Sequence, residues 1–210
     1  MIKILIVDDH TIVRKGLKQI LEATPDMKVV DEASNGQEVI EKIDNNDYDL
    51  ILLDISLPGR GGLDVLKQIK ASQPELPVLI LSMYPEEQYA IRSLRARASG
   101  YLTKESAPDE LIDAIRRIAE GKKYITSSLA EKLAFELEVN ARISMHETLS
   151  DREYQVMCMI ASGKRIKEIA EILSLSVKTI STYRSRILRK MEMKNNAQIT
   201  YYAIRNGLIV

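Results

Sequence analysis

The chain has 210 residues, of which 45% are hydrophobic and 29% charged, a composition typical of a globular protein with one large or two modest domains. Its apolar runs are far shorter than the roughly 20 residues that a membrane helix needs, and no cationic leader precedes one of them, so we expect a cytoplasmic protein without a membrane partner. The single cysteine, Cys158, excludes an intramolecular disulfide, and its apolar neighbours predict a core position.

A formal net charge of zero conceals an uneven distribution along the chain. Residues 1–140 carry 18 Lys and Arg against 24 Asp and Glu, whereas residues 141–210 carry 12 against 6. The two parts therefore have net charges of −6 and +6. This asymmetry indicates two units with different partners, of which the basic C-terminal one suits a polyanion.

Short β-rich runs alternate with amphipathic helical stretches over the first 121 residues. Residues 50–53 and 78–81 are apolar on both faces of their strands, as expected where helices cover both sides of a parallel sheet. The pattern predicts an α/β fold, a doubly wound five-stranded parallel sheet. Its strands are expected at 2–7, 28–33, 50–54, 77–82 and 99–103, and its helices at 12–23, 36–46, 62–72, 86–96 and 107–121.

The rest of the chain has no strand pattern. Residues 122–147 are expected to form a partly helical linker, with a helix opened by a serine cap at 127. Residues 148–210 show four helical periods separated by brief turn signals, at 149–163, 165–176, 177–193 and 195–209. We therefore predict an α/β domain over 1–121, the linker, and a small all-α domain over 148–210.

Chemistry-bearing residues gather at the carboxyl ends of the predicted strands, where ligands collect in such sheets. They are Asp8, Asp9, Asp54, Ser82 and Lys104. Clustered carboxylates repel one another unless a cation joins them, and oxygen ligands suit Mg²⁺ better than zinc. With metal and Lys104 to neutralise incoming charge and Ser82 to offer a hydroxyl, Asp54 is the natural nucleophile for an aspartyl phosphate.

These residues closely resemble the receiver domain of response regulators, in the segments "VDDH", "LLDISLPGRGGLDVL", "LILS" and "SGYLTK". The resemblance implies that a partner histidine kinase phosphorylates Asp54, and that Asp9, Asp54 and the Ser56 carbonyl bind magnesium directly. Asp8 would help through water. Ser82 would follow the phosphoryl group inward and Tyr101 would change rotamer with it. We expect His10 to begin the first helix, and a ligand role beside its acidic neighbours is the less favoured alternative.

Three positions depart from the usual receiver pattern. Gly61 stands where the family usually has an acidic residue, which affects the loop after Asp54. Arg97 replaces a glycine, so the end of the fourth helix loses a residue suited to a left-handed cap. Glu105 follows Lys104 where many receivers have proline, which leaves the geometry of that peptide open.

Helices 165–176 and 177–193 have the pattern of a helix-turn-helix. Along the second of them, apolar residues including Val177 are expected to face inward, while hydroxyls and cations face out as a major-groove reader requires. Basic side chains such as Arg186 and Arg189, together with Tyr183, would bind phosphates. A solvated amphipathic helix with ordinary charges is the alternative from composition alone.

The motifs "LSDRE", "ASGKRIKEIAEILSLSVKTISTYRSRILRKM" and "AIRNGLI" resemble the LuxR-type DNA-binding domain, and the whole chain resembles NarL/FixJ response regulators. The resemblance implies base contacts from Ser181, Thr182 and Ser185. It places Lys178, Thr179 and Arg184 near the DNA backbone. Ser181 and Tyr183 replace the lysine and histidine of many relatives, so their operator preference does not transfer.

Together these features predict a transcription factor and not an enzyme. Phosphorylation of Asp54 would shift the receiver to a state that frees the DNA-binding domain and lets it dimerise on double-stranded DNA. One alternative is a pseudo-receiver that works without phosphorylation. Another is a magnesium phosphohydrolase, although Ser56 stands where such enzymes have a second aspartate. A flavodoxin-like carrier is disfavoured because "DDHTIVR" lacks a phosphate loop.

Overall fold

The computed structural model describes residues 1–138 and 144–209, and the predicted helix at 127–141 extends in part beyond them. The chain divides into two compact units, Met1–Ala130 and Glu131–Val210, and each is considered by itself. None of the helices within the described ranges combines the length and the apolar character that crossing a membrane requires.

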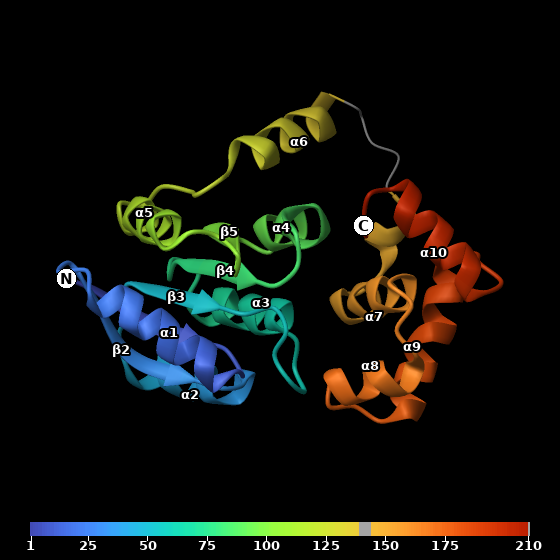
Figure 1. The fold of residues 1–210 in the computed structure, drawn as a ribbon, viewed down its shortest axis with the longest axis horizontal. Coiled ribbons are helices and arrows are strands. Elements are labelled where there is room, and N and C mark those ends of the chain that lie inside the picture. The colour runs from blue at the N-terminus through green and yellow to red at the C-terminus, as the bar shows by residue number, and fades with distance from the viewer. Residues whose placement is uncertain (139–143, 210) are drawn as a thin grey trace. The chain divides into compact units, whose positions relative to one another are not determined.

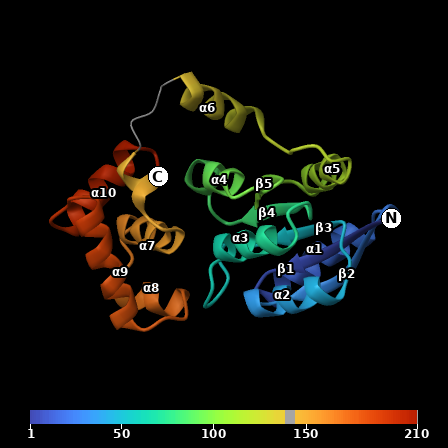
Figure 2. The same cartoon turned by 180° about the vertical axis from the view of Figure 1, so that it is seen from behind.

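A five-stranded parallel sheet lies between helices in the first unit (Figures 1 and 2). Its strands in spatial order are β2 (Met27–Ala33), β1 (Ile2–Val7), β3 (Leu50–Leu53), β4 (Val78–Ser82) and β5 (Gly100–Thr103). Every residue of β3 and β4 is buried, as their unbroken aliphatic sequences predict. The predicted doubly wound α/β fold is confirmed.

Four helices connect the strands: α1 (Thr11–Glu22), α2 (Gly36–Asn45), α3 (Gly62–Ser72) and α4 (Glu86–Arg95). A fifth helix, α5 (Pro108–Ala119), follows β5. Helices α1 and α5 share one hydrophobic core with alternate residues of all five strands, among them Ile4, Ile6 and Leu52. The intervening residues, such as Leu5 and Leu53, are equally buried, so the sheet is covered on both faces. Helix burial on both faces leaves the strand ends as the accessible part of the sheet.

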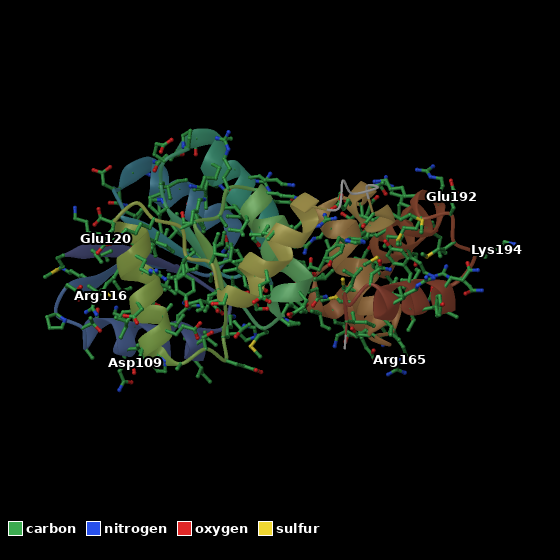
Figure 3. The ribbon with its side chains drawn as sticks, turned by 90° about the horizontal axis from the view of Figure 1, so that it is seen from above. Asp109, Arg116, Glu120, Arg165, Glu192 and Lys194 are labelled. Carbon is green, nitrogen blue, oxygen red and sulfur yellow. The ribbon has the colours of Figure 1, made fainter. Side chains whose placement is uncertain are left out.

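Helix α5 also shows how charged side chains anchor the surface of this unit. Asp109, Arg116 and Glu120 project along it (Figure 3), and the Arg116 guanidinium donates two hydrogen bonds to Asp26, at 2.9 and 3.0 Å. This bidentate pair ties α5 to the segment that precedes β2.

Helix α6 (Ser127–Glu138) lies in the predicted linker. We expected a serine to cap this helix, but the capping residue is Thr126. Its Oγ1 accepts a hydrogen bond from the Leu129 N–H at 3.3 Å and donates one to Glu86 at 2.7 Å. The contact with Glu86 explains the choice of cap, because it fixes the threonine hydroxyl against α4.

The second unit is helical. Its elements are the short 3₁₀ helix η1 (Met145–Thr148) and the helices α7 (Asp151–Ala161), α8 (Ile166–Ile172), α9 (Val177–Lys190) and α10 (Asn196–Arg205). Nearly all of α7 is buried, including Cys158, which confirms the predicted core position. A capping box of Ser150 and Glu153 begins α7.

Candidate functional site

Two aspartates lie side by side because their strands are neighbours in register. Val7 of β1 pairs with Leu53 of β3, and the Asp54 N–H donates to the Val7 carbonyl at 2.9 Å. Asp8 and Asp54 come next in each strand and are 1% and 2% exposed. The register therefore places two buried carboxyl groups at one edge of the sheet.

Lys104 completes an ion-pair cluster at this edge. Its Nζ lies 2.5 Å from Asp8 Oδ2 and 2.7 Å from Asp54 Oδ2, and its backbone N–H donates to the Ser82 carbonyl at 2.7 Å. Burial raises the pKa of the Asp54 carboxyl above its ordinary value, against the opposing effect of Lys104. Burial alone lowers the pKa of Lys104, but the two carboxylates outweigh it and raise the pKa overall, so the lysine stays cationic.

Asp9 and His10 stand beside this cluster. The His10 Nδ1 lies 2.8 Å from Asp9 Oδ1 and 3.4 Å from Asp8 Oδ1. Ligand atoms of Asp8, Asp9, His10 and Asp54 all lie within 4.8 Å of one another. His10 begins α1 as expected, as its N-cap, and its imidazole also joins the acidic group, which the sequence analysis gave only as the less favoured alternative.

The donor set fits a hard divalent cation. Three carboxylates face one lysine ammonium, which leaves the cluster with negative charge in excess, and oxygen atoms predominate among the possible ligands. Oxygen-rich sites of this kind favour Mg²⁺. The predicted ligands Asp8, Asp9 and Asp54 are thus brought together, and the Ser56 N–H donates to Asp54 Oδ1 at 3.0 Å.

Ser82 and Tyr101 meet at the turn that follows β4. The Ser82 Oγ accepts a hydrogen bond from the Tyr84 N–H at 3.1 Å, and the Tyr101 hydroxyl donates to the Tyr84 carbonyl at 2.7 Å. Both side chains are fully buried, and burial raises the pKa of Tyr101, which remains a donor. The two predicted switch residues therefore hold the same residue of the β4–α4 turn.

The loop after Asp54 depends on glycines. A Cβ at Gly62 would lie 2.1 Å from the Asp54 carbonyl oxygen, and Gly59 has a left-handed φ of +69°. Gly61, by contrast, is the N-cap of α3 with φ −64°, so its backbone does not require glycine. Gly61 gives this helix no side-chain cap, and its φ is one that other amino acids adopt without strain.

The structure also shows the backbone at the other two departures, Arg97 and Glu105. Arg97 adopts the left-handed conformation itself, with φ 69°, and the Arg97 and Ala98 N–H groups still close the end of α4 onto Leu94 and Ser93. The helix end expected to be lost is therefore kept, with backbone strain. The peptide before Glu105 is trans, as are all peptide bonds of the described residues.

In the second unit, α8 and α9 form a helix-turn-helix. Ser176 caps α9 by accepting from the Thr179 N–H at 3.0 Å, and Ile180 and Ile187 bury the inner face of the helix. Val177 was expected to face inward but is 50% exposed, because it starts the helix at the turn and lies outside the packed stripe. Helix α9 therefore has a polar outer face that is exposed to solvent.

The predicted DNA-contacting residues lie along this outer face. Thr179, Tyr183 and Arg184 are partly buried, and the Arg184 Nε donates to the Asn196 Oδ1 at 2.6 Å. The exposed members are Lys178, Ser181, Thr182, Ser185, Arg186 and Arg189. Two of the hydroxyls are already used, because Thr182 and Ser185 donate to the carbonyls of Lys178 and Ser181.

The far end of α9 is anchored to α7. Lys190 Nζ lies 2.6 Å from the buried Glu153 Oε2, and this pairing, with Ser150, keeps the pKa of Glu153 below its ordinary value in spite of its burial. Glu192 and Lys194 mark the turn that follows α9 (Figure 3). The outer face of α9 is thereby held in a fixed orientation relative to the core of the second unit.

Comparisons with known proteins find a family match in each part of the chain. Residues 4–116 match the response regulator receiver domain, and residues 147–203 match the bacterial regulatory proteins of the luxR family. Response regulator UvrY of Escherichia coli strain K12 is 39% identical over 209 residues, 99% of this chain and 96% of UvrY. The chain belongs to the NarL/FixJ family of response regulators.

Further relatives match this response regulator over nearly its whole length. Response regulator GacA of Pseudomonas aeruginosa is 33% identical over 210 residues, which cover all of this chain and 98% of GacA. A crystal structure of Salmonella typhimurium RcsB superposes on this chain with a TM-score of 0.63. The two sequences are 28% identical, and the match covers 97% of this chain and 100% of the RcsB chain. A second RcsB structure, bound to promoter rprA with the phosphomimetic BeF₃⁻, gives a TM-score of 0.64 at 28% identity, covering 96% and 98% of the two chains.

The structure also reveals a residue of the response regulator that its sequence did not single out. Arg14 of α1 donates from Nη1 to the Asp8 carbonyl at 2.7 Å. Its position six residues after Asp8 carries no signal by itself, because the contact depends on the turn between β1 and α1. The Arg14 spacing becomes meaningful only once that turn is known.

Proposed function

We propose that this response regulator is switched by phosphorylation of Asp54, which a sensor histidine kinase carries out in a magnesium-dependent reaction. The observation that carries this proposal is the buried Asp54 carboxylate with the Lys104 ammonium 2.7 Å away. An Asp54 oxygen would bond to phosphorus as the phosphorus–nitrogen bond of the kinase phosphohistidine breaks, and the histidine nitrogen would keep the electron pair. The ammonium is placed to stabilise the added negative charge.

Asp8, Asp9 and Asp54 would hold the magnesium ion, together with the Ser56 carbonyl. Bound magnesium would supply neutralisation of the phosphoryl charge. Lys104 keeps Asp8 and Asp54 at the same edge before any ion binds, through its 2.5 and 2.7 Å contacts. His10 is near enough to hold Asp9 in place, at 2.8 Å.

The change would reach the rest of the receiver through the β4–α4 turn. The Ser82 hydroxyl now accepts a hydrogen bond from the Tyr84 N–H. A phosphoryl group on Asp54 would draw this hydroxyl toward the phosphate and away from Tyr84. Tyr101 holds the carbonyl of the same residue. The turn and α4 are therefore the bistable element that phosphorylation would bias, as a population shift.

The kinase would dock at the edge of the sheet where the phosphoacceptor lies. Ile12 of α1 is 87% exposed and Met83, which follows β4, is 62% exposed, both at the strand-end edge of the sheet. Large exposed apolar side chains beside a reactive site suit a transient partner.

The second unit would bind double-stranded DNA through α9. The exposed cations Lys178, Arg186 and Arg189 suit phosphates, and Ser181 and Thr182 suit base edges. DNA as the partner would place the protein in the cytoplasm. Released by phosphorylation, two copies would pair through α10 and read two half-sites.

The first step is tested by incubating the full chain with acetyl phosphate and Mg²⁺ and measuring intact mass. Wild type should gain one phosphoryl group, and Asp54→Asn should gain none. An Asp54→Asn chain that is phosphorylated as readily as wild type would refute Asp54 as the acceptor. Sustained hydrolysis of a small phosphate ester would instead favour a phosphohydrolase, and operator affinity that ignores phosphorylation would favour the pseudo-receiver.

The DNA step is tested by genome-wide footprinting with and without the phosphoryl donor. Occupied sites should increase in number or strength when the donor is present. A footprint that is the same in both conditions, with Asp54 shown to be phosphorylated, would contradict the switch.

A further inference from the structure

The Arg14 side chain bridges the acidic edge of the sheet to strand β2. Its Nη1 donates to the Asp8 carbonyl at 2.7 Å, its Nε to Glu32 Oε2 at 3.3 Å, and its Nη2 to Thr11 Oγ1 at 3.3 Å. The side chain is only 14% exposed. Three contacts from one planar fork hold the guanidinium in a single orientation.

The Asp8 carbonyl belongs to the peptide that leads into Asp9. Because a peptide unit is planar, a fixed carbonyl oxygen also fixes the nitrogen and Cα of the next residue. The Asp8 N–H is fixed from the other side, since it donates to the Ala33 carbonyl of β2 at 3.1 Å. The direction in which the Asp9 side chain leaves the backbone is therefore set by what holds this peptide.

We propose that Arg14 is a positioning residue for the metal site, which acts by clamping the Asp8–Asp9 peptide so that both carboxylates face Asp54. The inference rests on the proposed function, because it concerns the magnesium that Asp54 phosphorylation needs. Arg14 itself touches neither the carboxylates of the cluster nor the transferred group; its contact is with the backbone that carries them.

Lys18 offers a matched control on the same helix. Its Nζ lies 3.3 Å from Glu32 Oε1, so it shares the acidic partner of Arg14. Among the described residues, the Lys18 ammonium contacts Glu32 alone, whereas the Arg14 guanidinium also reaches the Asp8 carbonyl. Replacing either residue by methionine removes one positive charge from α1, but only one of the two changes releases the peptide clamp.

If Arg14 acts only through its charge, removing it should raise the affinity for Mg²⁺; if Arg14 positions the carboxylates, removing it should lower that affinity. Removing a nearby cation makes the acidic pocket more negative, which by Coulomb attraction alone tightens Mg²⁺ binding. Releasing a carboxylate from its supporting contact weakens binding, and the loss of such outer contacts typically lowers metal affinity about 10- to 100-fold. The direction of the change therefore separates the two explanations.

The test is calorimetric titration of the full chain with Mg²⁺ for wild type, Arg14→Met and Lys18→Met. Arg14→Met should bind Mg²⁺ about 10-fold or more weakly than wild type, and Lys18→Met should bind it equally or more tightly. Thermal unfolding of each variant shows that it is folded. Arg14→Met that binds Mg²⁺ as tightly as wild type would overturn the proposal.

A kinetic readout separates positioning from general damage. With acetyl phosphate as donor, Arg14→Met should need more Mg²⁺ for half-maximal phosphorylation of Asp54 and regain nearly the wild-type rate at saturating Mg²⁺. A rate that stays low at saturation would contradict positioning. If wild type itself is not phosphorylated, the proposed function fails; if wild type is and Arg14→Met matches it at every Mg²⁺ concentration, only the inference about Arg14 fails.

Discussion

A side chain at position 62 would collide with the backbone that carries Asp54. The Gly62 Cβ position lies 2.1 Å from the Asp54 carbonyl oxygen and 2.6 Å from the Ile55 Cα, both of them atoms that cannot rotate away. The start of α3 can therefore approach the phosphoacceptor strand only through a glycine. Single residues of this kind control how closely the helix layer supports the site.

We expect Gly62→Ala to lower the free energy of unfolding by about 1–3 kcal/mol, since backbone must shift to accept the methyl group. Phosphorylation of Asp54 by acetyl phosphate should slow as well. Gly16→Ala is the control: nothing lies within 4 Å of its Cβ position in α1, so the change should stabilise the chain by about 0.5–1 kcal/mol. Chemical denaturation of both variants checks this, and equal effects would contradict the steric account.

Asp54 makes a second prediction at this scale, on pH. Burial raises the pKa of its carboxyl in the folded chain, so the folded chain holds the proton more tightly than the unfolded chain does. Ionisation of Asp54 therefore costs stability as pH rises through that folded pKa. Without Mg²⁺, Asp54→Asn should unfold at a higher temperature than wild type near neutral pH, and the difference should shrink as the medium becomes acidic.

The control for this pH series is Asp47→Asn, which removes an exposed carboxylate. Its melting temperature should follow that of wild type across the series. A constant difference between wild type and Asp54→Asn at every pH would contradict the electrostatic cause.

At the scale of elements, the sequence predicted the strands well because their apolar runs and turn residues are local signals. The convergence of Asp8, Asp54 and Lys104 was also predictable, since the carboxyl ends of parallel strands share one edge. The contacts of Arg14 and His10 were not predictable, because they depend on side-chain orientations within one turn. Val177 was placed wrongly because helical periodicity does not say where the packed stripe begins.

At the end of α4, a non-glycine residue adopts a backbone conformation that normally favours glycine. Arg97 takes a left-handed conformation that costs a non-glycine residue about 1–2 kcal/mol. Arg97→Gly should relieve this strain and raise the free energy of unfolding, by about 1 kcal/mol after the chain-entropy cost of glycine. Arg97→Ala keeps the strain and should bring no such gain. Urea denaturation distinguishes the two, and equal stabilisation by alanine would contradict the backbone explanation.

At the scale of the whole molecule, an acidic receiver precedes a basic DNA-binding unit, and α10 of the latter exposes apolar side chains. Tyr201 and Ile204, three residues apart on one helical face, are 66% and 60% exposed. We propose that the protein acts as a dimer. Apolar side chains that are this exposed suit a helix face that a second copy of the chain covers.

We expect Ile204→Lys to weaken dimerisation of the phosphorylated chain and its affinity for paired half-sites, because a charge would be buried in the contact. Ile172→Lys changes an exposed isoleucine of α8, 48% exposed, and should leave dimerisation intact. Sedimentation velocity of both variants, with and without acetyl phosphate, measures the effect. A dimer that forms equally well with lysine at position 204 would place the contact elsewhere.

The turn after β4 has an evolutionary consequence. Ser82 and Tyr101 both bind the main chain of Tyr84, one at its N–H and the other at its carbonyl. Neither bond uses the tyrosine ring, so another amino acid with a backbone N–H could replace Tyr84 and keep both hydrogen bonds. Proline is the replacement that selection should reject, for it has no N–H to offer the serine.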